Sequence, residues 1–158
     1  MNNLRYFMKI AEETAKLSTC IAYQVGCVFI KDKRIILTSY NGVASGKEHC
    51  NDKFTAENYK DLNHHEWSKN NELHAEQNGI SYAAKNGIPL KDCSMFVTLM
   101  PCIDCAKQIL ASGIKTVYYK DEYKNSDGVK FLKEHKIDCF QFNFDYISET
   151  EYLMGDDK

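Results

Sequence analysis

The sequence predicts an α/β fold in which a five-stranded mixed sheet carries helices on both faces. Two β-rich segments separated by a polar turn form a hairpin early in the chain. Strand-like segments then alternate with helical ones, as in sheets whose parallel strands are joined by crossover helices. A chain of 158 residues is long enough for one sizeable core and shows no internal repeat. We therefore expect a single domain over residues 1–158.

The expected elements follow the chain in order. Apolar residues from Leu4 to Leu17 recur at helical spacing with charged residues opposite, which predicts a first helix. The hairpin strands are expected at 25–30 and 34–40, and Asn41-Gly42 marks the end of the second strand. The remaining elements are a helix over about 73–85 with Ile80, Ala83 and Ala84 inward, a strand over 94–99, a helix over 101–112 with Pro101 in its opening turn, a strand over 115–120, a short helix over 129–135 and a last strand over 138–142.

Residues 43–71 show no periodicity and are rich in Gly, Asn, Lys, Asp and His. A connection of this length inside a compact domain is usually functional or poorly ordered. It carries His49, Cys50, His64 and His65, so we expect it to be held in place. The acidic tail past about residue 152 is expected to be flexible.

Composition narrows the class of function. The net charge of −2 lacks the excess of positive charge that nucleic-acid-binding domains carry, which favours a small substrate. No apolar run approaches the roughly 20 residues of a membrane helix. Seven cysteines at scattered spacing form no even disulfide framework, and the chain opens without a charged-then-apolar leader. We expect a protein of the reducing cytoplasm that binds neither nucleic acid nor membrane.

Two short motifs carry the chemistry: His74-Ala75-Glu76 and Pro101-Cys102-Ile103-Asp104-Cys105. One histidine and two cysteines supply three zinc ligands, and three protein ligands with an open fourth position are typical of a catalytic zinc. Glu76 is then placed to carry a proton from a metal-activated water to a leaving group. The pattern H-x-E followed by P-C-x-x-C is the signature of zinc nucleobase deaminases.

A Cys-x-x-Cys pair by itself also occurs in redox sites and in structural zinc half-sites. The redox interpretation lacks the usual Gly-Pro between the cysteines and leaves His74 and Glu76 without a role. The expected helices place His74 and both cysteines in first turns, where the helix dipoles favour thiolates.

Beyond the motifs, the chain resembles the deoxycytidylate (dCMP) deaminases, specifically those of T-even phages. The similarity extends over nearly the whole chain from the first helix to Tyr123. It rests on residues 18–20, 24–26, 34–36, 40–42, 64–68, 71–76, 96–99, 101–107 and 112–123.

The resemblance implies a cytidine-deaminase-like three-layer α/β/α sandwich. It also implies a hydrolase that acts on the C–N bond of a cyclic amidine, converting dCMP to dUMP and ammonia for thymidylate synthesis. In that family the residues matching His74, Cys102 and Cys105 bind zinc, the activated water attacks C4 of cytosine, and the glutamate matching Glu76 moves the proton.

The resemblance further implies substrate contacts from Asn41 to sugar and base, from Glu72 to the deoxyribose hydroxyl, and from Tyr123 near phosphate or base. Without the resemblance, we would interpret Asn41 as a turn residue beside Gly42, Glu72 as a helix cap and Tyr123 as a core residue.

Regulation and assembly are also implied by the resemblance. Family members are typically hexamers, activated by dCTP with Mg²⁺ and inhibited by dTTP at a site that includes the residues matching Tyr40, Asn41 and Gly42. This chain has Ser39 where the family usually has glycine, which restricts the backbone of that loop.

A second, structural zinc is implied as well. Cys20 and Cys50 match thiols that hold such a zinc in the phage enzymes, and His64 with His49 or His65 would complete the set. The alternative is that Cys20 is a core thiol and the histidines lie in a polar loop. Cys27, Cys93 and Cys139 fall on or beside strand-like stretches and are expected to be inert buried thiols.

Two other functions stay open at this point. One is a different zinc deaminase, acting on a free nucleoside, on guanine or on an adenosine in tRNA; the acidic net charge argues against the tRNA substrate. The other is a non-catalytic zinc-binding assembly module, against which Glu76 argues.

Overall fold

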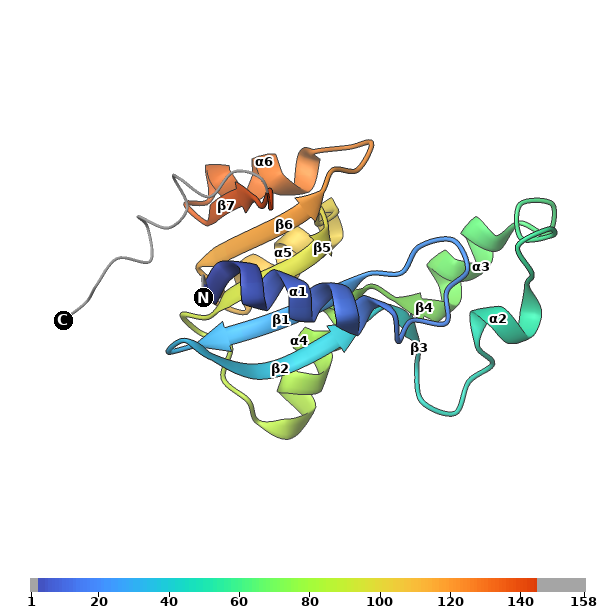
Figure 1. Ribbon diagram of the computed structural model, residues 1–158, viewed down its shortest axis with the longest axis horizontal. Coiled ribbons are helices and arrows are strands. Elements are labelled where there is room, and N and C mark those ends of the chain that lie inside the picture. Colours follow the sequence, from blue (N-terminus) through green and yellow to red (C-terminus); the bar gives the residue numbers. More distant parts are fainter. Residues whose placement is uncertain (1–2, 145–158) are drawn as a thin grey trace.

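The computed structural model describes residues 3–144, so the tail past about residue 152 lies outside the described residues. Figure 1 shows the elements in the colours of the chain. In chain order they are α1 (Asn3–Ala15), β1 (Gly26–Lys31), β2 (Arg34–Tyr40), β3 (Gly42–Val43), α2 (Cys50–Lys53), α3 (His64–Asn71), β4 (Glu72–Leu73), α4 (Ala75–Asn86), β5 (Ser94–Leu99), α5 (Ile103–Ala111), β6 (Thr116–Asp121), α6 (Asp127–Glu134) and β7 (Asp138–Gln141).

The main sheet has five strands in the order β2-β1-β5-β6-β7. β1 is antiparallel to both of its neighbours, β2 and β5, whereas β5, β6 and β7 run parallel. The parallel strands are joined through α5 and α6, as crossover connections require. The expected five-stranded mixed sheet is confirmed.

Helices cover both faces of the sheet and make the three layers (Figure 1). The α1 face holds one buried cluster, in which Phe7 packs on Phe96 and Phe96 stacks on Tyr118 with ring centroids 4.5 Å apart. The opposite face holds a larger cluster beneath α4, α5 and α6. Its helical members are Ala75, Ala83, Ala106, Ile109, Val129 and Leu132.

The turn between β1 and β2 consists of Asp32 and Lys33, both with positive φ, at 50° and 60°. Two consecutive left-handed residues make the type I′ geometry whose twist matches a two-residue hairpin. The expected hairpin therefore forms without glycine in its turn.

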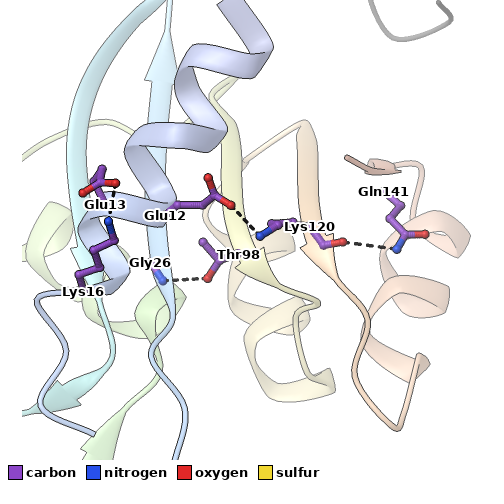
Figure 2. Close-up of polar contacts among 7 residues, drawn as sticks. All are labelled: Glu12, Glu13, Lys16, Gly26, Thr98, Lys120 and Gln141. Atoms are coloured by element: carbon purple, nitrogen blue, oxygen red, sulfur yellow. Dashed lines mark hydrogen bonds and ion pairs between the residues drawn. The ribbon is translucent and has the colours of Figure 1, made fainter. Parts of the chain in front are cut away.

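An ion pair ties α1 to its face of the sheet, and a hydrogen bond on the same face joins β1 to β5 (Figure 2). Lys120 of β6 forms an ion pair with Glu12 at 2.6 Å, and the backbone N–H of Gly26 donates to Thr98 Oγ1 at 3.1 Å. A Cβ on Gly26 would lie 2.1 Å from the carbonyl oxygen of Ala11. The helix thus approaches β1 more closely than any side chain at this position would allow.

The helix boundaries differ from expectation in three places. α1 ends at Ala15, and Leu17, expected on the inner face, is 63% exposed. α4 begins at Ala75, and Ala84 is exposed while Ala83 is buried. Pro101 does not open α5, because Cys102 is the N-cap with an extended backbone (φ −73°, ψ 170°).

The segment over 43–71, for which no element was expected, contains α2 and α3 and extends away from the main sheet (Figure 1). β3 and β4 pair antiparallel at its two ends, with Gly42 opposite Leu73 and Val43 opposite Glu72. A third buried cluster of Cys20, Cys50 and Phe54 holds the segment against the loop after α1. The expectation that this segment is held in place is confirmed.

None of the helices within residues 3–144 has the length and apolarity needed to span a bilayer.

Gly26 provides a test of the α1 packing. We expect Gly26→Ala to lower the free energy of unfolding by about 2–3 kcal/mol, because the added methyl overlaps the α1 backbone. Gly42→Ala is the matched control, since its Cβ would have nothing within 4 Å. Urea denaturation of both variants checks this, and equal losses would show that the close approach does not limit stability.

Candidate metal centres and active site

The residues that carry the two sequence motifs meet at one edge of the main sheet. β5 and β6 are parallel, so their carboxyl ends lie at the same edge. The start of β1 and the end of β2 lie there too, because β1 is antiparallel to both β5 and β2. α4 and α5 begin at this edge, since their cap residues are in contact.

The first metal centre consists of His74, Cys102 and Cys105. His74 Nδ1 lies 3.6 Å from Cys102 Sγ and 3.4 Å from Cys105 Sγ. Ligand atoms of a tetrahedral zinc, with bonds of 2.0–2.3 Å, are separated by roughly 3.5–3.8 Å. The three donors therefore fit a zinc ion that has one coordination position left for water or substrate.

Both helix starts contribute their cap residue to this centre. His74 is the N-cap of α4, and its backbone N–H donates to Gln77 Oε1 at 3.0 Å, as in a capping box. Cys102 is the N-cap of α5. α6 supports the second start, because a Cβ on Gly128 would lie 2.1 Å from the carbonyl oxygen of Pro101.

The charges of this centre favour a cation. Hydrogen bonds from Cys105 and from His74 hold the pKa of the Cys102 thiol well below its usual range. The hydrogen bond with Cys102 in turn raises the pKa of His74. The lowered pKa favours the thiolate of Cys102, and a thiolate is the form that binds metal.

Glu76 lies in the first turn of α4 and is only 4% exposed. Burial raises the pKa of its carboxyl group to about 7, against opposing contributions from its own backbone N–H and the charge of His74. A carboxyl group with a near-neutral pKa can both accept and donate a proton at physiological pH.

A second group of potential metal ligands consists of Cys20, Cys50, His64 and Glu72, whose donor atoms all lie within 4.8 Å of one another. His64 Nε2 is 3.6 Å from Cys20 Sγ and 3.2 Å from Cys50 Sγ. Four donors of these types fit a closed tetrahedral site.

Backbone N–H groups point at both sulfurs of this second centre. Ile21 donates to Cys50 Sγ at 3.4 Å, and the N–H groups of Ala22 and Tyr23 donate to Cys20. Burial nevertheless raises the pKa of Cys20 to about 12. Such donors stabilise thiolates once a cation has displaced the protons.

Glu72 also fits a role in the second centre. Its Oε2 accepts a hydrogen bond from Ser68 Oγ at 2.5 Å, whereas Oε1 is buried and has no partner among the described residues. A buried carboxylate oxygen without a partner is costly, and a cation would satisfy it. The residue expected at the deoxyribose hydroxyl therefore lies among metal donors.

The other two histidines of the segment over 43–71 belong to neither group of donors. His49 is exposed, and its Nδ1 is 3.4 Å from Thr19 Oγ1. His65 is exposed on α3. No residue pattern identifies Glu72 as a member of this group, because β4 is only two residues long and lacks periodicity.

Both ends of the Asn41 side-chain amide form hydrogen bonds with the backbone. Its Oδ1 accepts from the Val25 N–H at 2.8 Å, and its Nδ2 donates to the Tyr23 carbonyl at 2.8 Å. Asn41 is 7% exposed. It therefore fastens the segment before β1 to the end of β2, at the edge where the first centre lies.

Of the neighbouring candidates, Tyr40 and Tyr123 are exposed, whereas Gly42 is buried. The carbonyl of Tyr40 accepts a hydrogen bond from Asn78 of α4 at 2.8 Å, and Gly42 lies in β3. Tyr123 follows β6 at the same sheet edge, is 40% exposed and packs edge-on against Tyr23 with ring centroids 6.0 Å apart.

An open hollow of about 510 Å³ adjoins the second centre rather than the first. It is lined by the segment from Ser18 to Ala22 together with Gln24, Asn51 and Ala56. The three remaining thiols, Cys27, Cys93 and Cys139, are buried outside both centres.

Comparison with known proteins gives consistent matches. Residues 1–121 match the family described as the cytidine and deoxycytidylate deaminase zinc-binding region. The deoxycytidylate deaminase of Enterobacteria phage T2 is 34% identical over 178 aligned positions, covering 90% of this chain and 95% of that protein. The phage T4 deoxycytidylate deaminase is 35% identical over 153 positions, covering 77% and 79%.

Among solved structures, the dCMP deaminase of cyanophage S-TIM5 in complex with dCMP and dUMP superposes with a TM-score of 0.73 at 28% identity. The superposition covers 88% of this chain and 96% of that one.

The contacts of Asn41 generate a stability prediction. We expect Asn41→Asp to lower the free energy of unfolding by about 2–3 kcal/mol, because a carboxylate oxygen replaces the donor to the Tyr23 carbonyl. The control is Asn58→Asp, which keeps the oxygen that accepts from Thr55 N–H. Thermal or urea denaturation measures both. Unchanged stability of Asn41→Asp would mean that this amide is free for other partners.

Proposed function

The chain belongs to the zinc-dependent cytidine and deoxycytidylate deaminase family, and on that premise we propose that it hydrolyses dCMP to dUMP and ammonia. The observation that carries the proposal is the convergence of His74, Cys102 and Cys105, with Glu76 buried in the adjoining helical turn. The similarity to a phage dCMP deaminase with bound dCMP and dUMP supports this choice of substrate.

The three donors of the first centre would hold zinc through His74 Nδ1 and the two sulfurs. Zinc bound there supplies Lewis acidity, which brings the pKa of a water molecule toward neutrality. The protein places this centre beside the starts of α4 and α5, where the positive ends of both helix dipoles stabilise the thiolates.

Glu76 is the proton carrier in this proposal. Its carboxylate accepts a proton from the water that attacks C4 of cytosine, and passes this proton to N3 of the ring. It then moves the proton of the new C4 hydroxyl to the departing amino group. The C4–O bond forms, the C4–N bond breaks, and ammonia leaves. Burial of Glu76 excludes bulk water from this transfer.

Substrate contacts are proposed at the same sheet edge. Tyr123 and Tyr23 present exposed rings there, which suits contact with the base or the phosphate end of a nucleotide. Asn41 has both ends of its amide bonded to the backbone, so we propose that it shapes this edge through the segment over 23–25. Glu72 is assigned to the second centre instead of to the deoxyribose.

The second centre is proposed to be a structural zinc site with Cys20, Cys50, His64 and Glu72 as its ligands. The unpartnered Oε1 of Glu72 and the N–H groups directed at both sulfurs support this donor set. The resemblance implied His49 or His65 as the fourth ligand. In this proposal Glu72 takes that place, because both histidines lie outside the group.

Regulation by dCTP with Mg²⁺, inhibition by dTTP and assembly into hexamers are proposed from the family resemblance. The hydrogen bond from Asn78 to Tyr40 supports a link between the Tyr40-Asn41-Gly42 loop and the active-site helix α4. Thiol ligands require a reducing compartment, for which we propose the cytoplasm. An assay of dCMP turnover with dCTP, and separately with dTTP, tests the regulation.

The role of Glu76 gives the first functional prediction. We expect Glu76→Gln to lower kcat for dCMP by about 10²- to 10⁴-fold, because the amide cannot carry a proton. The zinc content should not change, because Glu76 is not among the three donors. The fall in absorbance at 280–290 nm as dCMP is converted to dUMP measures turnover. Elemental analysis measures the zinc content.

The matched control is Glu122→Gln, an exposed carboxyl group that follows β6 at the same edge and should retain full activity. Retained activity in Glu76→Gln would show that Glu76 is not the proton carrier. If the wild-type protein deaminates deoxycytidine, guanine or tRNA but not dCMP, it is a deaminase with a different substrate from the one proposed. A protein that binds zinc and deaminates none of these would be a non-catalytic module.

The ligand set of the second centre gives a separate prediction. We expect zinc at both centres of the purified wild type and a fall toward one zinc per chain in Glu72→Ala, with a lower unfolding temperature. His49→Ala is the control and should keep both ions. Zinc loss in His49→Ala with full occupancy in Glu72→Ala would restore the histidine as the fourth ligand.

A further inference from the structure

Ser39 of β2 makes a contact that the proposed reaction does not yet use. Its Oγ donates a hydrogen bond to the carbonyl of Ala75 at 2.7 Å, and the residue is 6% exposed. Ser39 lies two residues after Leu37 on the strand, so it faces the same side of the sheet, toward α4.

The acceptor is the first residue of α4. Ala75 lies between His74, a donor of the first centre, and Glu76. The Ala75 carbonyl belongs to the same peptide unit as the Glu76 N–H, so fixing its oxygen fixes the direction in which the backbone enters Glu76.

The carboxyl group of Glu76 depends on this backbone for its own position. Its own backbone N–H is a hydrogen-bonding partner of this carboxyl group. A shift of the Ala75–Glu76 peptide would therefore carry the carboxyl group with it, relative to the three metal donors.

The contact between β2 and this turn is close. Gly79 lies one helical turn after Ala75, and a Cβ there would lie 2.6 Å from Ser39 Oγ and 2.4 Å from the ring of Phe29. The next residue of the strand, Tyr40, accepts a hydrogen bond from Asn78 at 2.8 Å. Two consecutive residues of β2 thus hold the first turn of α4.

We propose that Ser39 is a positioning residue for Glu76, holding the first turn of α4 through the Ala75 carbonyl. The inference rests on the proposed deamination and adds a residue outside the two motifs to it. The rate of a catalysed step falls steeply when a reacting group is misplaced, even where the substrate still binds.

The test is Ser39→Ala in the zinc-loaded protein. We expect kcat for dCMP to fall about tenfold with KM unchanged and zinc content unchanged, because the substitution disturbs the proton carrier and removes no donor. Ser39→Cys keeps a hydrogen-bond donor, although a weaker one on a larger atom, and should give an intermediate kcat.

Thr98→Val is the matched control. Thr98 is a similarly buried hydroxyl, 8% exposed, that accepts from the Gly26 N–H beneath α1 on the opposite face of the sheet (Figure 2). It should lose stability as Ser39→Ala does while keeping the wild-type kcat. Equal losses of kcat in the two variants, or a wild-type kcat in Ser39→Ala, would overturn the proposal.

Hydrogen exchange without substrate separates this inference from the choice of substrate. In an α-helix the Gly79 N–H bonds to the Ala75 carbonyl, so loosening this carbonyl exposes that amide. We expect amides over 76–80 to exchange several-fold faster in Ser39→Ala than in the wild type or in Thr98→Val. Unchanged exchange would contradict the proposal even if dCMP proves not to be the substrate.

Discussion

The arrangement of this protein depends on the meeting of two helix starts at one edge of a mixed sheet. His74 and Cys102 are the N-caps of α4 and α5, and their side chains are in contact. Neither helix could bring its donor there alone. The parallel pairing of β5 with β6 fixes where α5 begins, and the contacts of β2 with the first turn of α4 fix where α4 begins. A metal centre of two helix caps is therefore sensitive to the register of the sheet and to the helices packed behind it.

Much of this arrangement could be predicted from the sequence, because the strands and most of the helices have strong local patterns. β-rich segments around a polar turn predict the hairpin, an apolar run predicts the strand over 94–99, and spacing identifies the two motifs. The start of α5 was misplaced because Pro101 suits a first turn, whereas the extended backbone of Cys102 makes it a cap. Periodicity describes the interior of an element, and the residues of this site lie at element ends.

The segment over 43–71 was harder to predict for a different reason. Its interior is a small cluster of Cys20, Cys50 and Phe54 closed by polar donors, so the sequence offers no apolar stripe. Glu72 shows the difficulty best. The resemblance placed it at the substrate, while the fold places it among sulfur and imidazole donors two residues before His74. Its neighbours come from the loop after α1, from α2 and from α3, and no local spacing reveals such a convergence.

The short ladder between β3 and β4 has a consequence for how this architecture can vary. Gly42 pairs with Leu73 and Val43 with Glu72, so the excursion that contains α2 and α3 leaves and rejoins the domain at adjacent points. A loop whose ends already touch adds little closure entropy when residues are inserted or deleted within it. Its length is thus uncoupled from the sheet, which leaves evolution or a protein engineer free to lengthen, trim or exchange the excursion without changing the spacing of the catalytic helices.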